Sequence, residues 1–590
     1  MTILALHLGH NATATVAENG EILGVLSQEK IDGIKNSAVF PGEAINALLA
    51  QSGKKIEDIT DVAIAGTSIF PARCYAHLQG NRTQHQERKA NRTAKDFANS
   101  ILRKTAPPLY RLLRQGLQRK LVDEGLAELK RNLDAHKLDR VQLHFHDHHL
   151  CHARAAYHSL VPNDGKPCLV FTADGSGDGL SATVTKIDEK GRWERLGRTG
   201  ESASLGAVYS GTTRFLGMRE LEHEYKVMGL APYAKDYYLD TYRRLYDPII
   251  SLSKDGLGFQ GSMNTIWFYQ YLCKEAPGER FDNLAAAAQH LIEERVLAWV
   301  QKVIQKTGIR RIATGGGLFM NIKLNMQIQA LSEIEDVYFL PSCGDESNAI
   351  GAAYDLMALQ LGNTQPLTSL YLGLAYKDED VEAFLKKHRV FERFNVTRPV
   401  DIDEETATRL AAGEIVARFS RRNEWGARAL GNRSILGHPG RIESFYAIND
   451  QIKCRDFWMP FAPTILDRLA QNYLVGYKPE KSPAPHMITA FKASNMGKDH
   501  LRAALHQGDH TLRPQVLTKN ANPSYYRLIE SFEKQTGIGG VLNTSMNVHG
   551  KPLVATLEQA LWTLENSGLQ NLALGPFMIS KKEDAFPEAI

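Results

Sequence analysis

The stretch Ile-Leu-Ala-Leu-His-Leu-Gly-His-Asn-Ala (residues 3–12) opens the chain and gives the first indication of its fold. Its apolar part has the composition of a buried β-strand, and a polar turn follows at residues 9–12. A second strand is expected at residues 13–17. Asn19-Gly20 then predicts a tight hairpin, because both residue types accept a positive φ, and a third strand is expected at residues 21–28. The chain therefore begins with a predicted three-stranded antiparallel meander.

The same arrangement returns roughly 165 residues further along the chain. Strands are expected at residues 168–173, 180–187 and 193–198. Asp174-Gly175-Ser176-Gly177-Asp178-Gly179 is the polar turn between the first two strands, and Lys190-Gly191 is the turn before the third. Two such units predict a duplicated α/β domain with a cleft between its halves.

Two strand–loop–helix units follow the repeat. A short strand at residues 311–314 ends in Gly315-Gly316-Gly317, which either brings the backbone close to a phosphate or ribose or marks a simple tight turn. Another strand at residues 337–340 runs into the polar loop 342–348, and a helix rich in small residues is expected at 349–359. Ligands of α/β folds bind at such loops, so both loops are candidate binding sites.

Length and composition limit the possible classes of protein. A chain of 590 residues and 65.7 kDa is expected to form two to four domains, and we place a boundary near residue 366. With 43% hydrophobic and 23% charged residues, the composition excludes a disordered, collagen-like or coiled-coil chain. We expect no signal peptide, because residues 1–7 lack a basic region and a cleavage site, and the sequence contains no apolar run long enough to span a membrane and no Cys-x-x-Cys pair. These features predict a reduced, cytoplasmic protein, and the net charge of +4 alone implies neither nucleic acid nor membrane binding.

Residues 82–140 differ from the rest of the chain. They contain 15 Lys and Arg but 7 Asp and Glu, a local charge of +8, and their leucines recur at helical spacing. We interpret this segment as an amphipathic helical insertion with a solvated charged face. The alternative is a basic arm for a phosphate or an anionic acceptor. Aromatic residues are sparse in the segment, which disfavours a platform for single-stranded nucleic acid.

The sequence between residues 144 and 158 contains six histidines. His148 and His152 are four residues apart, which is the spacing at which two imidazoles on one helix face can bind one metal ion. Asp174 and Asp345 each follow a strand and could supply carboxylate ligands. Such a donor set suits iron, zinc or manganese, and the sequence does not choose among them. The alternative is a polar helix surface with unligated histidines.

Cations are concentrated in the C-terminal part of the chain and alternate there with Gly, Trp and Phe. This context is typical of a buried anion pocket, where guanidinium groups bind phosphate, rather than of a solvated charged face, which is the alternative. A loop of short polar residues at 543–547 follows a strand at 540–542 and is expected to join the pocket. The cations are Arg418, Arg421, Arg422, Arg428, Arg433, Lys453, Arg455 and Arg513.

Strings spread over nearly the whole chain resemble the O-carbamoyltransferases of antibiotic tailoring and nodulation-factor modification. The most diagnostic is the long arginine-containing string at residues 424–436. The other matching strings are at residues 8–12, 148–153, 174–179, 224–233, 315–321, 344–347, 457–463, 513–515 and 543–547.

The resemblance implies an α/β fold with a duplicated actin/hexokinase-like (Kae1-like) domain at residues 1–365, which carries the insertion, and a YrdC-like domain at 366–590. The YrdC-like domain is expected to form carbamoyl adenylate from carbamoyl phosphate and ATP with Mg²⁺. The Kae1-like domain, which typically holds iron, is expected to pass the carbamoyl group to a hydroxyl of a small-molecule natural product or glycan.

The resemblance also implies site residues by position. His148, His152 and Asp345 are the expected metal ligands, with Asp174 as a fourth ligand and catalytic group. His10 is the expected catalytic base beside the acceptor hydroxyl. The expected cofactor contacts are Lys226, Gly316, Gly317, Asn321, Arg428, Arg433, Lys453, Arg455, Arg513, Asn543 and Ser545.

Three other functions are alternatives to the O-carbamoyltransferase interpretation. A threonylcarbamoyl-type tRNA-modifying enzyme is built from the same two domain types, and the basic insertion is its best support. An actin-like ATPase acting as a binding module would leave the arginine string and paired histidines unexplained. A hydrogenase-maturation carbamoyltransferase would carry zinc-finger cysteine pairs and an acylphosphatase domain, and neither is in this sequence. We expect no nucleic-acid or membrane partner; a homodimer, the acceptor and the metal identity stay open.

Overall fold

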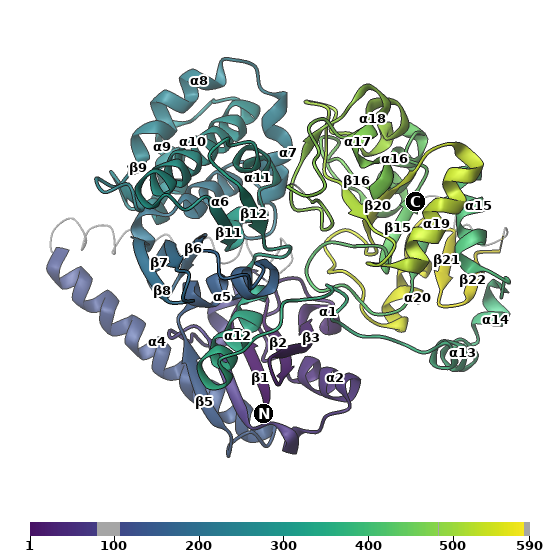
Figure 1. The fold of residues 1–590 in the computed structure, drawn as a ribbon, viewed down its shortest axis with the longest axis horizontal. Coiled ribbons are helices and arrows are strands. Elements are labelled where there is room, and N and C mark those ends of the chain that lie inside the picture. The colour runs from purple at the N-terminus through teal and green to yellow at the C-terminus, as the bar shows by residue number, and fades with distance from the viewer. Residues whose placement is uncertain (79–106, 482, 583–590) are drawn as a thin grey trace.

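The computed structural model of the protein describes residues 1–78, 107–481 and 483–582. The described strands form two five-stranded sheets, one eight-stranded sheet and two small two-stranded sheets. In Figure 1 the two five-stranded sheets lie on the left and the eight-stranded sheet lies on the right.

The two five-stranded sheets have the same topology. The first has the order β3-β2-β1-β4-β5 and the second has the order β8-β7-β6-β11-β12. In each sheet the first three strands of the chain are antiparallel and the last two are added in parallel. The predicted duplication is thereby confirmed, and the repeated unit is that of the actin/hexokinase class. The strands are β1 (Thr2–His7), β2 (Thr13–Glu18), β3 (Glu21–Ser27), β4 (Asp61–Ala65), β5 (Gln142–His146), β6 (Cys168–Gly177), β7 (Leu180–Ile187), β8 (Trp193–Gly200), β11 (Arg311–Gly315) and β12 (Asp336–Phe339).

Strand β6 extends further than its apolar run predicts. The sequence indicates an end at residue 173, but β6 continues to Gly177 after a register shift against β7. The irregularity lies where the buried apolar residues give way to Asp174 and the glycines that follow it. It therefore places a carboxylate at the carboxyl end of a central strand, where ligands bind in α/β folds.

Two helices fill the space between the duplicated sheets. α12 (Asn348–Leu361) lies on β1 and β4 of the first sheet, and α5 (His148–Leu160) lies on β6 and β11 of the second. The helices also pack on each other, so the core has the layers sheet, helix, helix, sheet. The contact is close because Gly351 of α12 has no side chain: a Cβ there would collide with the carbonyl oxygen of Cys151.

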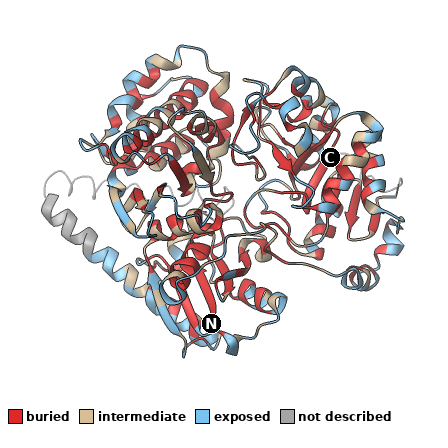
Figure 2. Ribbon diagram, in the orientation of Figure 1, coloured by how far each residue is buried: buried red, intermediate tan, exposed pale blue. Residues whose placement is uncertain are grey.

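A long helix, α4 (Pro107–Ala135), projects beside the first sheet. Its C-terminal part packs through the buried Leu129 and Leu133, whereas Leu117 is 59% exposed. Figure 2 shows that the described outer part of the helix is mostly exposed. The helical prediction for the insertion holds for α4, and residues 82–106 of the predicted insertion lie outside the described residues. Among the described helices, none combines the length and apolarity needed to cross a membrane.

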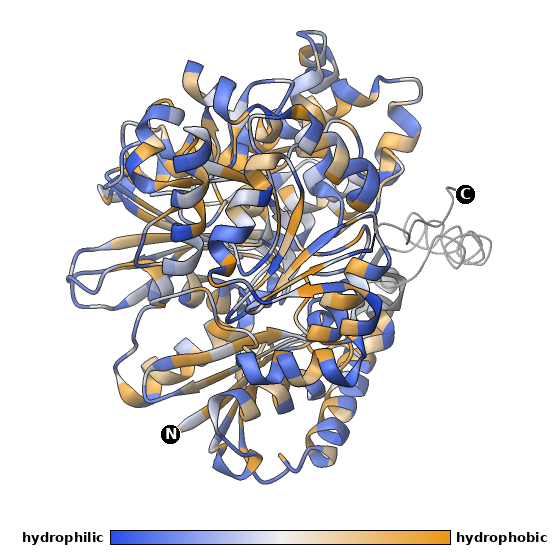
Figure 3. Cartoon of the chain, turned by 90° about the vertical axis from the view of Figure 1, so that its right-hand side faces the viewer, coloured by the Kyte–Doolittle hydropathy of each residue, from blue (hydrophilic) through white to orange (hydrophobic). Residues whose placement is uncertain are grey.

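The C-terminal part is built on the eight-stranded mixed sheet, with the order β13-β22-β21-β14-β15-β20-β16-β19. Figure 3 views the chain from this side and shows apolar strands enclosed by helices with hydrophilic outer faces. This is the C-terminal α/β domain expected from the sequence. The predicted boundary near residue 366 falls between α12 and α13 (Asp378–Lys387) and stays a prediction. The strands are β13 (Asn395–Thr397), β14 (Val416–Phe419), β15 (Arg433–Gly437), β16 (Ala462–Leu466), β19 (Gln515–Leu517), β20 (Gly540–Ser545), β21 (Asn571–Leu574) and β22 (Phe577–Ser580).

The C-terminal part packs against both duplicated halves. Lys30, which follows β3, donates from Nζ to the carbonyl oxygen of Glu424 at 2.7 Å, and both groups are buried. On the other half, Asn325 donates from Nδ2 to the carbonyl oxygen of Ile488 at 2.7 Å. Because each contact uses a buried polar group and a main-chain oxygen, the relative placement of the parts is specified by geometry as well as by apolar packing.

We expect Gly351→Ala to lower the free energy of unfolding by about 1–3 kcal/mol, because the added methyl group must push α12 away from the main chain of α5. Gly116→Ala in the exposed part of α4 is the matched control, since an added Cβ there meets no described atom within 4 Å. Urea unfolding of both variants measures the difference. Equal stability of the two variants would show that the α5–α12 contact is not close-packed.

Candidate metal centre and active site

Four buried or half-buried side chains converge at the carboxyl ends of β6 and β12. His148 and His152 face each other one turn apart on α5, with their Nε2 atoms 3.2 Å apart. Asp174 Oδ2 lies 3.3 Å from His148 Nε2 and 3.4 Å from His152 Nε2. Asp345 Oδ1 lies 3.5 Å from each of the same two nitrogens. One ligand atom from each of the four residues thus falls within 4.8 Å of the others.

The electrostatics of this cluster favour a bound cation. Burial alone would raise the pKa of Asp174, but hydrogen bonds from His148 and His152 outweigh it and hold that pKa well below its usual value. Burial lowers the pKa of His152, yet the hydrogen bonds with Asp174 and Asp345 raise it to about 9. Two ionised carboxylates and two imidazole nitrogens at these separations fit a divalent metal ion of the iron, zinc or manganese type. The structure brings together the four proposed ligands; their role stays a prediction.

The other four histidines of the predicted cluster bond to protein groups instead. The contacts are His144 Nε2 to Asp61 Oδ1 at 2.9 Å, His146 Nδ1 to Asp355 Oδ2 at 2.7 Å, His149 Nδ1 to Thr172 Oγ1 at 2.9 Å and His158 Nδ1 to Thr364 Oγ1 at 2.8 Å. Each of these side chains has a structural partner, and of the six histidines His148 and His152 are the two that converge on both Asp174 and Asp345.

His10 lies beside the metal cluster. Its Nε2 is 3.3 Å from Asp345 Oδ2, the carboxylate oxygen that does not face the two helix histidines. The loop that carries it turns sharply, with φ of 125° at Gly9 and 61° at Asn11. The side chain is 23% exposed, so it can be reached from solvent.

His7 is a neighbour that sequence reasoning missed. Its Nε2 lies 3.2 Å from the carbonyl oxygen of His10 and 3.7 Å from Asp345 Oδ2. Burial lowers the pKa of His7 to about 4, so the ring is neutral and its Nε2–H can donate to that carbonyl. Its position as the last residue of β1, directly before the turn, was the available signal.

The glycine triplet lies against Asp174. Gly316 has a φ of 92°, and a Cβ there would collide with the carbonyl oxygen of Ala173. A Cβ on Gly317 would come within 2.9 Å of Asp174 Oδ1. The glycines therefore allow two strand ends to meet, which is a sufficient structural reason for them, and their nucleotide contacts stay a prediction.

Asn321 has its amide occupied by protein groups. It pairs with Gln289, donating from Nδ2 to Gln289 Oε1 at 2.8 Å and accepting from Gln289 Nε2 at 3.1 Å. It also caps α11 (Ile322–Gln329) by accepting from the Leu324 amide at 3.1 Å. Tyr209 donates to the same Gln289 oxygen at 3.0 Å. A nucleotide would have to compete with these bonds or meet Asn321 by another atom.

The C-terminal part contains one buried and three half-buried cations without anionic partners among the described residues. Arg428, Lys453, Arg455 and Arg513 form no ion pair within the described residues. Burial lowers the pKa of Arg513 well below its usual value, and repulsion by Arg428 and Arg455 lowers it further. We name these four residues the cationic chamber. Because an uncompensated buried charge is costly, such a set points to an anionic ligand.

Polar groups from β20 adjoin the cationic chamber. Lys453 donates from Nζ to the main chain and hydroxyl of Ser545 and to the carbonyl oxygen of Asn547, the last at 2.9 Å. Asn543 donates from Nδ2 to Thr464 Oγ1 at 3.0 Å, while its Oδ1 is buried without a partner among the described residues. Lys453 and Ser545 are thus in contact, as expected for one pocket.

Two predicted contacts have protein partners. Arg433 is fully buried, donates to the carbonyl oxygens of Ser420 and Asn432 at 2.7 and 2.9 Å, and stacks on the Phe419 ring at 3.5 Å. This gives its guanidinium a structural role at the base of the loop that carries Arg428. Lys226 forms an ion pair with Asp456 Oδ2 at 2.9 Å across the contact between the N- and C-terminal parts.

The cationic chamber adjoins the loop that carries Asp345. The charge of Arg428 interacts with Cys343 and Glu346, the residues on either side of Gly344 and Asp345. Gly426, in the same loop as Arg428, lies so close to Ser342 that a Cβ would touch its side chain. The metal cluster and the chamber therefore face one another across a single loop.

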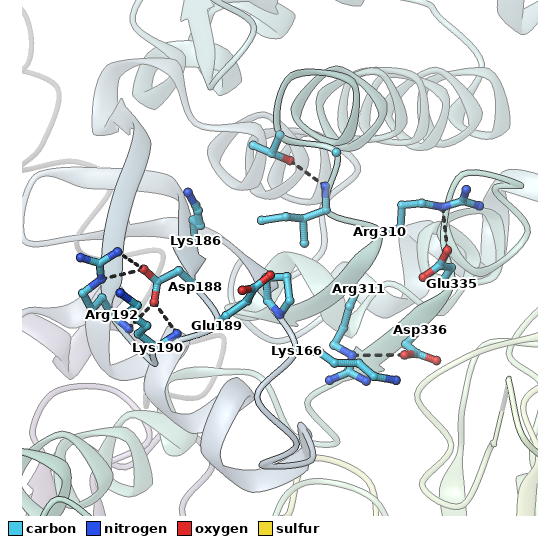
Figure 4. Close-up of a pocket in the computed structure, with 14 residues that line it drawn as sticks. Lys166, Lys186, Asp188, Glu189, Lys190, Arg192, Arg310, Arg311, Glu335 and Asp336 are labelled. Atoms are coloured by element: carbon cyan, nitrogen blue, oxygen red, sulfur yellow. Dashed lines mark hydrogen bonds and ion pairs between the residues drawn. The ribbon is translucent and has the colours of Figure 1, made fainter.

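A separate hollow of about 610 Å³ lies at the opposite ends of the second sheet's strands (Figure 4). Its arginines are paired: Arg311 with Asp164 and Asp336, Arg310 with Glu335, and Arg192 with Asp188. Ligand sites of α/β folds lie at the carboxyl ends of strands, so this hollow is not the candidate site.

Comparison with known proteins agrees with this architecture. Residues 2–354 match the family described as Carbamoyltransferase N-terminus, and residues 407–581 match Carbamoyltransferase C-terminus. An uncharacterized protein of Methanocaldococcus jannaschii is 32% identical over 486 residues, covering 78% of this chain and 77% of that protein. Nodulation protein NolNO of Sinorhizobium fredii is 29% identical over 596 residues, covering 98% of this chain and 80% of that protein.

The fold and the two charged sites define an enzyme of the actin/hexokinase structural class joined to a cation-rich α/β domain. The chain belongs to the carbamoyltransferase family, as its matching strings predict. The family implies carbamoyl phosphate and an acceptor as substrates.

We expect the purified protein to carry about one divalent metal ion per chain, which a chelator removes. His152→Gln should lose this ion because it deletes a nitrogen that faces both carboxylates. His149→Gln is the matched control, since His149 lies on the same helix as His152 but its ring bonds to Thr172 of β6. Elemental analysis of the two variants gives the result; retention of the ion by His152→Gln contradicts the assignment.

Proposed function

We propose that the protein is an ATP-dependent O-carbamoyltransferase that works in two steps at two sites, residues 366–590 forming carbamoyl adenylate and residues 1–365 transferring the carbamoyl group to a hydroxyl. One observation supports this proposal above the others: a cluster with two carboxylates and a chamber of unpaired cations meet at the loop of Ser342 to Glu346. Two adjacent sites of opposite charge are what two steps with opposite charge requirements would need, and this supports the proposal.

The first step needs cations to bring two anions together. Carbamoyl phosphate, ATP and water give carbamoyl adenylate, pyrophosphate and phosphate, and Mg²⁺ accompanies the nucleotide. Arg428, Arg455 and Arg513 offset the repulsion between the phosphate groups, and their planar guanidinium groups suit phosphate oxygens. Lys453, already oriented by Ser545 and Asn547, adds a point charge.

The second step needs a base, because an alcohol is a weak nucleophile at neutral pH. His10 is that base: with its proton on Nε2 it donates to Asp345 and keeps Nδ1 as the basic nitrogen. His7 holds the main chain of the loop at the carbonyl oxygen of His10. The acceptor proton passes to His10 as the acceptor oxygen attacks the carbamoyl carbon, and AMP leaves.

A metal ion would be held by His148, His152, Asp174 and Asp345, and once bound it supplies Lewis acidity toward a phosphate or carbonyl oxygen. The carboxylates and imidazoles of this chain would hold the ion beside the loop of residues 342–346, which also adjoins the cationic chamber. Because carbamoyl adenylate hydrolyses in water, this adjacency favours a closed passage from one site to the other.

Acceptor identity follows from product analysis. Mass spectrometry after incubation with ATP, carbamoyl phosphate and a panel of hydroxylated metabolites should reveal an acceptor that gains a carbamoyl group. Pyrophosphate release that depends on carbamoyl phosphate supports the enzyme, whereas none supports a binding module. If the protein retards a polynucleotide in an electrophoretic mobility-shift assay, and if this binding weakens strongly with added salt, the result would instead support the tRNA-modifying alternative.

We expect His148→Ala to lower carbamoyl transfer by at least about 100-fold and to leave pyrophosphate release unchanged, because the residue belongs to the metal cluster alone. His144→Ala is the matched control, since His144 bonds to Asp61 outside the cluster. Pyrophosphate and carbamoylated product are measured in the same reaction. Equal loss of both half-reactions contradicts the assignment of steps to sites.

We expect the converse for Arg513→Ala: pyrophosphate release falls by at least about 100-fold, while transfer from supplied carbamoyl adenylate continues. The exposed Arg468, paired with Glu533, gives the matched control Arg468→Ala. If transfer from the supplied adenylate is lost as well, the two sites do not divide the reaction in this way.

A further inference from the structure

The second aspartate of the Asp174–Gly179 turn has no role in the mechanism above. Asp178 lies between β6 and β7 with a φ of 49°, in the left-handed region. Its carboxylate accepts hydrogen bonds from main-chain amides of two other segments.

The Asp178 carboxylate accepts hydrogen bonds from backbone amides of two other segments, and the Thr67 side chain adds a further hydrogen bond. Oδ1 accepts from the amides of Thr67 at 3.0 Å and Ser68 at 2.9 Å. Oδ2 accepts from the amides of Thr67 at 2.9 Å and His148 at 2.9 Å. One side chain thus joins the β6–β7 turn, the segment after β4 and the first residue of α5.

These three segments belong to different parts of the duplicated domain. Thr67 and Ser68 follow a strand of the first sheet, whereas the β6–β7 turn belongs to the second sheet. The turn also packs directly against the His148 side chain of the metal cluster, because a Cβ on Gly177 would overlap the His148 ring. The main chain and the imidazole of His148 are therefore both positioned by this turn.

We propose that Asp178 is a positioning residue for the metal cluster: by binding the amides of both halves, it fixes His148 in the orientation in which its Nε2 faces Asp174 and Asp345. The inference rests on the proposed function, which makes His148 a ligand. The carboxylate is suited to this role because both of its oxygens are acceptors, and amide donors on both sides leave no place for an NH₂ group.

The helix does not depend on Asp178 for its own start. Asp147 caps α5 by accepting from the Leu150 amide at 2.7 Å, and Arg195 of β8 donates to the same carboxylate oxygen at 2.9 Å. Removal of the Asp178 charge should therefore leave α5 folded and should change only the orientation of its first residue, His148. A lowered metal affinity in a folded protein is the expected signature.

The first test is Asp178→Asn in the full-length protein, with metal affinity measured by competition against a chelator. Whichever way the amide is oriented, its NH₂ group faces the Thr67 amide and displaces the bond from either Ser68 or His148, so the side chain no longer holds all three amides. We expect affinity to fall about 10–100-fold, as for other groups that orient metal ligands, with pyrophosphate release unchanged.

Asp188→Asn is the matched control. Asp188 holds the next hairpin turn of the same sheet by accepting from the amides of Lys190 and Arg192, at 2.9 Å each, and lies away from the metal cluster. This variant should keep the affinity of the unaltered protein. Equal affinities of the two variants overturn the inference, and so does a fall in Asp178→Asn that Asp188→Asn shares.

The second test needs no variant. Amide hydrogen exchange of the unaltered protein should show the Thr67, Ser68 and His148 amides protected both with metal and after chelation, because Asp178 is not itself a ligand. Rapid exchange of these amides in the metal-loaded protein overturns the inference even if Asp178→Asn does not fold. A protein that binds no metal refutes the proposed function, whereas equal metal binding by the unaltered protein and Asp178→Asn refutes only the role of Asp178.

Discussion

The contact between α5 and α12 is the constraint on which the rest of the structure depends. These helices form the two middle layers between the duplicated sheets, and Gly351 allows the backbones to touch. α5 carries two of the four convergent donors, and α12 begins just after the loop that carries Asp345. The separations of 3.2–3.5 Å in the cluster therefore follow from apolar packing between helices, since a shift of either helix would separate the imidazoles from the carboxylate.

Both charged sites carry a desolvation penalty that lowers the stability of the fold, which indicates that their charged side chains are kept for binding. Partial or full burial of two carboxylates and of four cations removes part of their hydration, and within the described chain the cations of the chamber recover none of that cost through ion pairs. A protein selected for stability alone would replace such groups by apolar ones. Arg433 shows the contrast: it is more deeply buried than the arginines of the chamber, but carbonyl oxygens and the Phe419 ring occupy its guanidinium. Charge without a partner, rather than charge alone, separates ligand-binding arginines from structural ones.

Much of the fold was predictable because its signals are local. Alternation and turn residues indicated the strands of both repeats, and the four-residue spacing of His148 and His152 depends only on helix geometry. The places of Asp174 and Asp345 after strands made them candidate ligands, but their joint alignment with those histidines was expected only from the resemblance, because it depends on strand order. The role of Arg433 could not be predicted, since its partners lie on other segments of the chain, and the extension of β6 to Gly177 depends on pairing with β7. His7 carried only a weak signal, its place at a strand end.

Asp345 presents one oxygen to the helix histidines and the other to His10. Under the proposed function, a single carboxylate then takes part in both ion capture and proton transfer, and neither can be removed at this residue without disturbing the other. The ion site and the proton acceptor would thus be coupled through one carboxyl group, so that a change on either side would alter the charge that the other side experiences. Separating the two contributions has to proceed through the imidazoles on either side.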